Sequence, residues 1–381
     1  MEKSNAPLIV EVAVDELMGK RVIVRTGFDV PVEHAVVTND FRIREALPTI
    51  KYLVDAGAKV VILSHIGRDT ENTLAPVADA LRAYVPVTFI PDLTGEVAQH
   101  AVASLENGHC LMLENLRGDE RESTNDDAFA RALAQYGDLY IDEAFSVMHR
   151  SHASIVGIPK YIPSYLGIES AREITELTHA RTPNAPSLFI LGGSKFDTKI
   201  ALIESFLTRY ERIFVGGALA HDIWRARGIQ IGTSVTSDID LKGRPFLDNP
   251  ALLVPVDVVV QNKNGDTRTT VPTEVKPDEA IMDCGPDTVA LIASLAKEAR
   301  TILWNGPLGW YEKGFIQGTQ QTVEAIAHSE AYSIVGGGDT VAAIESTNVR
   351  SKIGFVSTGG GAMLELLLDG TLPGIEALNK S

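Results

Sequence analysis

Cysteine is scarce in this chain of 381 residues, which contains only Cys110 and Cys284. Both lie in apolar stretches, so we expect two buried free thiols rather than a disulfide, and a reducing compartment. The first residues, MEKSNAPLIVEV, lack the apolar core of a signal peptide, which predicts a cytoplasmic location. The chain also lacks an uninterrupted apolar run long enough for a bilayer, so no membrane partner is expected.

Basic residues are outnumbered as well, with 34 Lys and Arg against 50 Asp and Glu and a net charge of −16. This balance argues against a nucleic-acid partner, and it makes any local basic cluster more informative. Apolar residues make up 45% of the chain, which is enough for a sizeable core. The length is typical of two domains.

Two common nucleotide fingerprints are missing from the sequence. Neither the GxxxxGK[ST] loop nor the GxGxxG motif occurs. This weakens the interpretation as an ordinary P-loop protein or as a dinucleotide-dependent dehydrogenase.

The remaining pattern is an apolar strand, a turn and an amphipathic helix, repeated along the chain. It predicts an α/β fold of two doubly wound parallel-sheet domains joined by a long helix and hinge. Strands are expected at residues 21–25, 59–64, 87–90, 110–113, 139–141, 187–191, 212–215, 252–254, 301–304, 333–335 and 353–357. Helices are expected at 46–56, 74–84, 126–136 and, as the connector, 166–180. The polar stretch 261–272 is interpreted as a hairpin or loop.

Basic side chains follow several predicted strands in the first half. They are Arg42, Arg44, His65, Arg68, Arg117, His149, Arg150 and His152. In open α/β sheets ligands bind beyond the carboxyl ends of the strands, so these side chains are expected to converge on one anion. Arginine suits phosphate and carboxylate because its planar fork donates to two oxygens. For any one of them alone, a surface salt bridge is the alternative.

Glycine-rich turns follow the strands of the second half, and IVGGGDT at 334–340 is the most informative. A strand, a glycine turn and a helix start present free backbone amides to an anion. Asp339 would repel a bare phosphate, but it makes sense beside a phosphate-bound Mg²⁺. The alternative is an ordinary turn in which Asp339 caps the helix.

Other turns in this half carry similar signals. Lys195 and Lys199 are four residues apart in GGSKFDTK, so in a helical first turn they would share a face beside an anion. The alternative is a solvated helix end. The pair Gly216-Gly217 suits either a flat ring or a tight turn. Trp304-Asn305-Gly306-Pro307 follows a further strand, with Glu312 beyond it.

Together these stretches resemble the phosphoglycerate kinase family over nearly the whole chain. The matching segments are RIREALP at 42–48, GAKVVILSHIGR at 57–68, LENLR at 113–117, HRSHAS at 149–154, LGGSKFDTK at 191–199, LWNGPLG at 303–309, GGGDT at 336–340 and STGGGA at 357–362. The resemblance implies a reversible, ATP-dependent kinase that acts on the carboxylate of 3-phosphoglycerate. It also implies a monomer with a hinge.

The resemblance assigns the acceptor to an N-terminal lobe, residues 1–165, completed by a tail of about residues 360–381. His65, Arg68, Arg117 and Arg150 would hold the phosphate of the acceptor. Arg42 would lie at its carboxyl group and stabilise the moving phosphoryl, with Gly27 and Asp29 at the positions that face the hydroxyl.

The nucleotide is assigned to a C-terminal lobe, residues 166–359. Lys195 and Lys199 would contact its phosphates and act in catalysis, and Asp339 would bind Mg²⁺. The other residues implied in nucleotide binding are Gly216, Gly217, Asn305, Glu312, Gly337, Gly338 and Thr340.

The sequence departs from the family pattern chiefly near the reacting end of the acceptor. The family's Val-Asp-Phe-Asn-Val-Pro is Thr26-Gly27-Phe28-Asp29-Val30-Pro31 here, so the aspartate expected at the acceptor hydroxyl is Gly27. Further departures are Phe41, Gly118, Glu143, Ser146 and Ala218. The alternatives are therefore a paralogue acting on a related phosphorylated or phosphonate acid, and a non-catalytic binding paralogue.

Overall fold

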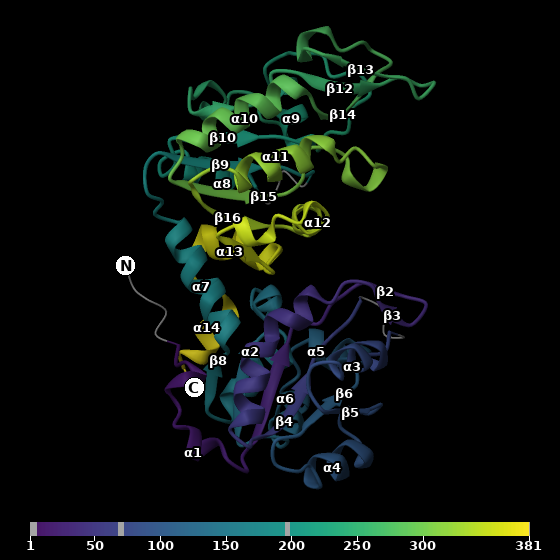
Figure 1. The fold of residues 1–381 in the computed structure, drawn as a ribbon, viewed down its shortest axis with the longest axis vertical. Helices are drawn as coiled ribbons and strands as arrows, with labels where there is room; N and C mark the ends of the chain where they lie inside the picture. The colour runs from purple at the N-terminus through teal and green to yellow at the C-terminus, as the bar shows by residue number, and fades with distance from the viewer. Residues whose placement is uncertain (1–5, 68–71, 195–198, 381) are drawn as a thin grey trace. The chain divides into compact units, whose positions relative to one another are not determined.

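The computed structural model describes residues 6–67, 72–194 and 199–380, which fold into two compact units (Figure 1). One unit is Met1–Thr175 with Asp369–Ser381, and the other is Glu176–Leu368. The division runs through helix α7 (Ile168–Ala180), all of which the sequence had assigned to the second lobe. It also leaves most of α13 (Gly361–Asp369) in the second unit, so the segment returning to the first unit is shorter than predicted.

The first unit is built on a six-stranded sheet in the order β5-β6-β4-β1-β7-β8. All neighbouring strands are parallel, as the sequence predicted. The strands are β1 (Arg21–Thr26), β4 (Lys59–Leu63), β5 (Val87–Ile90), β6 (Cys110–Leu113), β7 (Leu139–Glu143) and β8 (Ser164–Leu166). A short antiparallel hairpin, β2 (Val32–Glu33) and β3 (Val36–Val37), follows β1.

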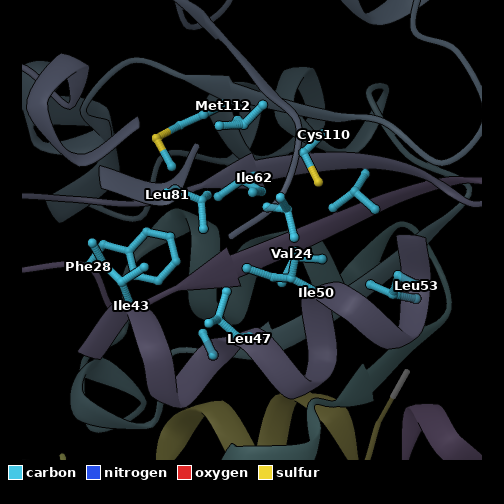
Figure 2. Packing of buried hydrophobic residues seen from close by; sticks show 14 of the residues in the cluster. Val24, Phe28, Ile43, Leu47, Ile50, Leu53, Ile62, Leu81, Cys110 and Met112 are labelled. Carbon is cyan, nitrogen blue, oxygen red and sulfur yellow. The ribbon is translucent and has the colours of Figure 1, made fainter. Parts of the chain in front are cut away.

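Helices cover this sheet because the central strands are apolar on both faces. They are α1 (Val14–Leu17), α2 (Phe41–Asp55), α3 (Ala75–Leu81), α4 (Glu96–Ala103), α5 (Glu120–Ser123), α6 (Asp127–Ala134), α7 and α14 (Pro373–Leu378). Figure 2 shows how one face is closed, with side chains of α2 packed toward the strands. Its labelled core residues include Val24, Ile43, Leu47, Ile50, Leu53 and Ile62.

Helix α2 begins five residues earlier than the sequence predicted. Asn39 accepts a hydrogen bond from the backbone N–H of Phe41 at 2.9 Å, and Phe41 is buried. Pro48 lies inside the helix and does not end it. The early start places Arg42 in the first turn of α2, close to the carboxyl end of β1.

The second unit repeats the architecture with a parallel sheet in the order β11-β10-β9-β15-β16-β17. Its strands are β9 (Ser187–Leu191), β10 (Arg212–Val215), β11 (Leu252–Leu253), β15 (Thr301–Asn305), β16 (Tyr332–Gly336) and β17 (Phe355–Ser357). Between β11 and β15 the chain forms a separate antiparallel sheet of β12 (Val258–Gln261), β13 (Thr267–Thr270) and β14 (Ala280–Cys284). The polar stretch 261–272 is thus the β12–β13 hairpin, one of the two alternatives that the sequence left open.

The main helices of this unit are α8 (Ile200–Phe206), α9 (Ala218–Ala226), α10 (Pro286–Glu298), α11 (Gln317–Ala327), α12 (Gly338–Thr347) and α13. Cys284 at the end of β14 and Cys110 in β6 are both buried and free, which confirms that expectation. In the part of the chain that the structure describes, none of the helices has the length and apolar character to cross a membrane.

Candidate active site

In the first unit, basic side chains gather around His65, just beyond the end of β4. The His65 side chain is almost completely buried. Its pKa lies well below the usual range, first because the ring is buried and then because arginines surround it. They are, in order of effect, Arg25, Arg117, Arg42 and Arg150. We call His65 and these four arginines the basic cluster; His65 is neutral at pH 7, and the positive charge is carried by arginine.

Arg25 is a member of the basic cluster that the sequence reasoning missed. It lies in β1 among apolar residues and is only 1% exposed. Its guanidinium donates to Ser154 Oγ at 2.8 Å and lies 3.1 Å from Nδ1 of His65. Glu122 is equally buried, 4.0 Å from the guanidinium, and its pKa is raised by burial against the opposing effect of Arg25. Arg25 therefore orients the ring of His65, and Ser154 and Glu122 hold Arg25 itself in place.

Asn115 fixes the loops that carry the basic cluster. Its side-chain oxygen accepts from the N–H groups of Ile66 and Arg117, at 3.2 and 3.1 Å. Its amide donates to the carbonyls of Ile66 and Asn72, at 3.0 and 2.9 Å. Asn115 is fully buried, so this arrangement locks the loop after β4 to the turn after β6. The LENLR motif thus positions Arg117 through its asparagine.

Asp29 and Arg42 meet at the same edge of the sheet. Asp29 Oδ1 accepts from the N–H of Gly67 at 2.9 Å, and Arg42 donates to the Asp29 carbonyl at 3.2 Å. Arg117 donates to the carbonyl of Gly67 from the other side. Burial lowers the pKa of Arg42, while Asp29 and Glu173 raise it. Arg68, a further predicted ligand, lies outside the described residues.

The second unit contains a cavity of about 270 Å³ beyond the ends of its parallel strands. Of the predicted nucleotide residues, Gly217, Glu312 and Asp339 line it. Gly216 does not: Leu308 fills the space that its Cβ would occupy, at 2.6 Å, and Leu308 lines the cavity instead. Asn305, Gly337, Gly338 and Thr340 lie at neighbouring strand and helix ends without lining the cavity.

Aromatic and apolar side chains form much of the cavity wall, and the sequence reasoning missed them. Among them are Trp224, Val258, Met282, Leu308 and Trp310. They come from α9, β12, β14 and the turn after β15, which are not adjacent in sequence, so apart from Leu308 in the LWNGPLG segment no motif marks them. A flat apolar ring with a polar rim suits such a wall.

The glycine turns of the second unit pack backbone against backbone. A Cβ on Gly192 would lie 2.2 Å from the carbonyl oxygen of Pro307, and one on Gly306 would lie 2.5 Å from the carbonyl of Gly192. Gly217 caps α9 with φ 61° and Gly337 caps α12 with φ 100°, a region that favours glycine. These glycines therefore bring the strand ends together, and the predicted approach of Gly217 and Gly337 to a ligand stays a prediction.

The start of α12 has the features of an anion and cation site. Asp339 lies in its first turn, and its pKa is raised by burial and then by the negative charge of Glu312. Thr340 Oγ1 is buried and has no hydrogen-bond partner among the described residues. A divalent cation between Asp339 and bound phosphates would relieve the carboxylate repulsion, so the residues present fit Mg²⁺.

Lys199 lies where the loop after β9 enters α8. It is the N-cap residue, directly before the first helical position, Ile200, and the rest of the turn predicted over 195–199 lies outside the described residues. Its ammonium donates to the carbonyl of Gly192 at 2.6 Å, and the side chain is buried. Lys195, its predicted partner, lies outside the described residues.

An arginine-rich cluster in one α/β unit and a cavity beside a helix start in the other fit a phosphotransferase. A family model described as phosphoglycerate kinase matches residues 12–370. The chain belongs to the phosphoglycerate kinase family, which confirms the resemblance and makes it a kinase.

Individual relatives agree with this assignment. The chain is 40% identical over 380 residues to the phosphoglycerate kinase of Herpetosiphon aurantiacus, covering 95% of this chain and 96% of the relative. It is 41% identical over 378 residues to that of Rubrobacter xylanophilus, with the same coverage. Among solved structures, phosphoglycerate kinase from Coxiella burnetii matches with TM-score 0.79 and 34% identity, and that from Pyrococcus horikoshii with TM-score 0.87 and 29% identity. Each of these two matches covers 98% of both chains.

Proposed function

We propose that this chain reversibly transfers a phosphoryl group between ATP and the carboxylate of 3-phosphoglycerate. The basic cluster carries this assignment, because four arginines around one neutral histidine are built to hold an anionic acceptor in an otherwise acidic chain. Phosphoryl transfer requires little covalent work from the protein and depends on positioning and positive charge.

In the acceptor site, Arg117, Arg150 and the neutral His65 bind the phosphate of 3-phosphoglycerate, and we assign Arg68 to the same group. His65 donates or accepts a hydrogen bond without adding charge, and Arg25 orients its ring. Arg42 lies at the start of α2 and stabilises the negative charge that develops on the transferring group. Fixing the acceptor in this way also supplies the in-line orientation that the reaction needs.

In the nucleotide site, the apolar wall holds the base and Glu312 accepts from the ribose hydroxyls. Lys195, Lys199 and the N-terminal amides of α12, from Gly338 to Thr340, bind the phosphates, and Asp339 holds Mg²⁺. When bound, Mg²⁺ neutralises phosphate charge. Because acceptor and nucleotide belong to different units, we expect a domain closure that also excludes water.

A coupled assay of ADP formation tests this function on the full chain with Mg-ATP. The panel contains 3-phosphoglycerate and related phosphorylated and phosphonate carboxylic acids. We expect turnover with 3-phosphoglycerate. Preference for another acid would instead identify an acyl-phosphate-forming paralogue, and nucleotide binding without turnover of any acid would identify a binding protein.

The setting of this activity follows from the composition. The two buried free thiols suit a reducing compartment, so we expect a cytoplasmic enzyme. The acidic net charge of −16 disfavours nucleic acid and anionic membranes as partners. We expect a monomer, and the molar mass in solution from light scattering tests that expectation.

A further inference from the structure

Gly27 and Ser146 face each other at the end of β1. Strands β1 and β7 pair in parallel up to Thr26 opposite Glu143, so the residues that follow them emerge side by side. A Cβ placed on Gly27 would lie 2.9 Å from Ser146 Oγ and 3.8 Å from the Cα of Ala144. The serine hydroxyl thus borders the space that a side chain at position 27 would need.

The Ser146 hydroxyl has no hydrogen-bond partner within the residues that the structure describes, although the turn that carries it is well fixed. Phe145 and Val147 on either side are buried. The N–H of Val147 donates to the carbonyl of Ala144 at 2.9 Å, and the N–H of Arg150 donates to the carbonyl of Val147 at 2.9 Å. Ser146 itself is partly exposed. A fixed, partly exposed hydroxyl in this position is therefore available to a ligand.

The same turn leads directly to the basic cluster. Arg150 lies four residues after Ser146, and His149, between them, lies against the backbone of Ser146. Asp29, the polar side chain two residues after Gly27, is already engaged through Oδ1 with the loop at Gly67. Ser146 is thus the better placed of the two to contact a neutral group on an acceptor bound by the arginines.

We propose that Ser146 determines acceptor specificity by hydrogen-bonding the hydroxyl group that the acceptor carries between its phosphate and its carboxylate. This inference rests on the proposed function. A serine hydroxyl both donates and accepts, so it matches a neutral hydroxyl without adding a negative charge beside the acceptor carboxylate. The absence of a side chain at Gly27 leaves the space in which the two hydroxyls meet.

The test pairs Ser146→Ala with two acceptors, 3-phosphoglycerate and its deoxy analogue, 3-phosphonooxypropanoate. In the wild type the deoxy analogue should be the poorer substrate. We expect Ser146→Ala to lower kcat/KM for 3-phosphoglycerate by about ten- to a hundredfold. For the deoxy analogue the change should be less than about twofold, because this analogue has no hydroxyl group with which Ser146 could form a hydrogen bond. Ser104→Ala, an exposed serine at the end of α4, is the matched control and should change neither value.

A second pair of variants tests the space itself. Gly27→Asp alone should impair 3-phosphoglycerate use, because a Cβ 2.9 Å from Ser146 Oγ would make the serine hydroxyl turn away from the acceptor. Gly27→Asp combined with Ser146→Gly should recover most of the lost kcat/KM, because the new carboxylate can then occupy the shared space and accept from the acceptor hydroxyl in place of the serine. Thermal melting of each variant identifies changes in folding, which would affect both acceptors alike.

The outcomes separate this inference from the function on which it rests. If Ser146→Ala leaves both acceptors unchanged, or weakens them equally, the specificity role is wrong while the kinase function stands. If the wild type does not phosphorylate 3-phosphoglycerate but does phosphorylate another acid, the proposed function itself is wrong.

Discussion

The two units share one architecture, yet they present opposite chemistry at the ends of their parallel strands. In the first unit the strand ends carry arginines, neutral His65 and the fixed loops around Asn115. In the second unit they carry glycine turns that pack on one another, beside a cavity with an apolar wall and three carboxylates, Asp283, Glu312 and Asp339.

Under the proposed function, the difference explains how one fold would bind two unlike ligands. A small phosphorylated acid offers only charge and hydrogen bonds, so its site is made of side chains that are themselves anchored by buried polar partners. A nucleotide offers a flat ring as well as phosphates, so its site combines apolar surface and backbone amides with charged side chains. Variants that affect only one of the two ligands can therefore test the comparison.

The largest expected effect is on the acceptor side, from Arg42→Ala. Loss of positive charge at the transferring group should lower kcat by about a hundred- to a thousandfold, with a smaller change in the KM for ATP. Steady-state kinetics with both substrates measures this split. Arg44→Ala is the matched control on the same helix, since Arg44 is exposed and pairs with Asp40 at 2.8 Å. A normal kcat with only a raised KM for ATP would show that Arg42 does not stabilise the transition state.

On the nucleotide side, Asp339→Ala should weaken Mg-ADP by about ten- to a hundredfold and leave metal-free ADP nearly unchanged. The reason is that the carboxylate acts on the cation and not on the nucleotide. Calorimetry with and without Mg²⁺ provides the two constants. Asp287→Ala, an exposed acidic residue in the first turn of α10, serves as the control. Equal weakening of both ligands would reject the metal role.

A smaller effect concerns Glu143, which has a structural role in the first unit. It accepts from Thr49 Oγ1 at 2.7 Å and from the N–H groups of Glu169 and Ser170, and burial raises its pKa to about 7. Its folded pKa exceeds the unfolded value of about 4.3, so its contribution to stability is complete below pH 4.3 and is lost as pH rises to about 7.

Glu143→Gln should remove this share of the pH dependence, which is at most about 1.4 kcal/mol per pH unit. Urea unfolding at intervals between pH 4.5 and 8 gives both slopes, and the wild type should lose more stability than the variant as pH rises. Parallel curves would show that Glu143 ionises freely in the folded protein.

The smallest effect has the opposite sign and belongs to the second unit. His221 lines the cavity, lies 2.7 Å from the carbonyl of Val235 through Nδ1, and has its pKa lowered by burial to about 4. Its folded pKa lies below the unfolded value of about 6.5, so stability is lost as pH falls from 6.5 to 4. His221→Gln should flatten that loss in the same unfolding series. An unchanged acid limb would assign the acid sensitivity to other groups.

The sequence predicted the sheets well because their strands are short apolar runs covered on both faces, and such runs stand out between turns. Strands β5, β6, β9 and β10 have the predicted bounds. Helix starts were less predictable, since that of α2 depends on the side chain of Asn39 and on burial of Phe41. The motif spacing likewise indicated which loops carry the basic cluster, because parallel strands end at one edge.

Other features depended on the tertiary structure, since they join residues far apart in the chain. In the sequence, Arg25 is a charged residue in an apolar strand with no evident partner. The structure places Ser154 and His65 beside its guanidinium. The cavity wall draws Trp224 and Trp310 from elements with no shared motif. Gly27 and Ser146 are two separate departures from the family pattern in the sequence. They border the same space only because β1 and β7 pair. The sequence determined the fold and the loops that carry the chemistry, because periodicity and motif spacing are local. Packing decided which side chains meet, because that depends on strand order and register.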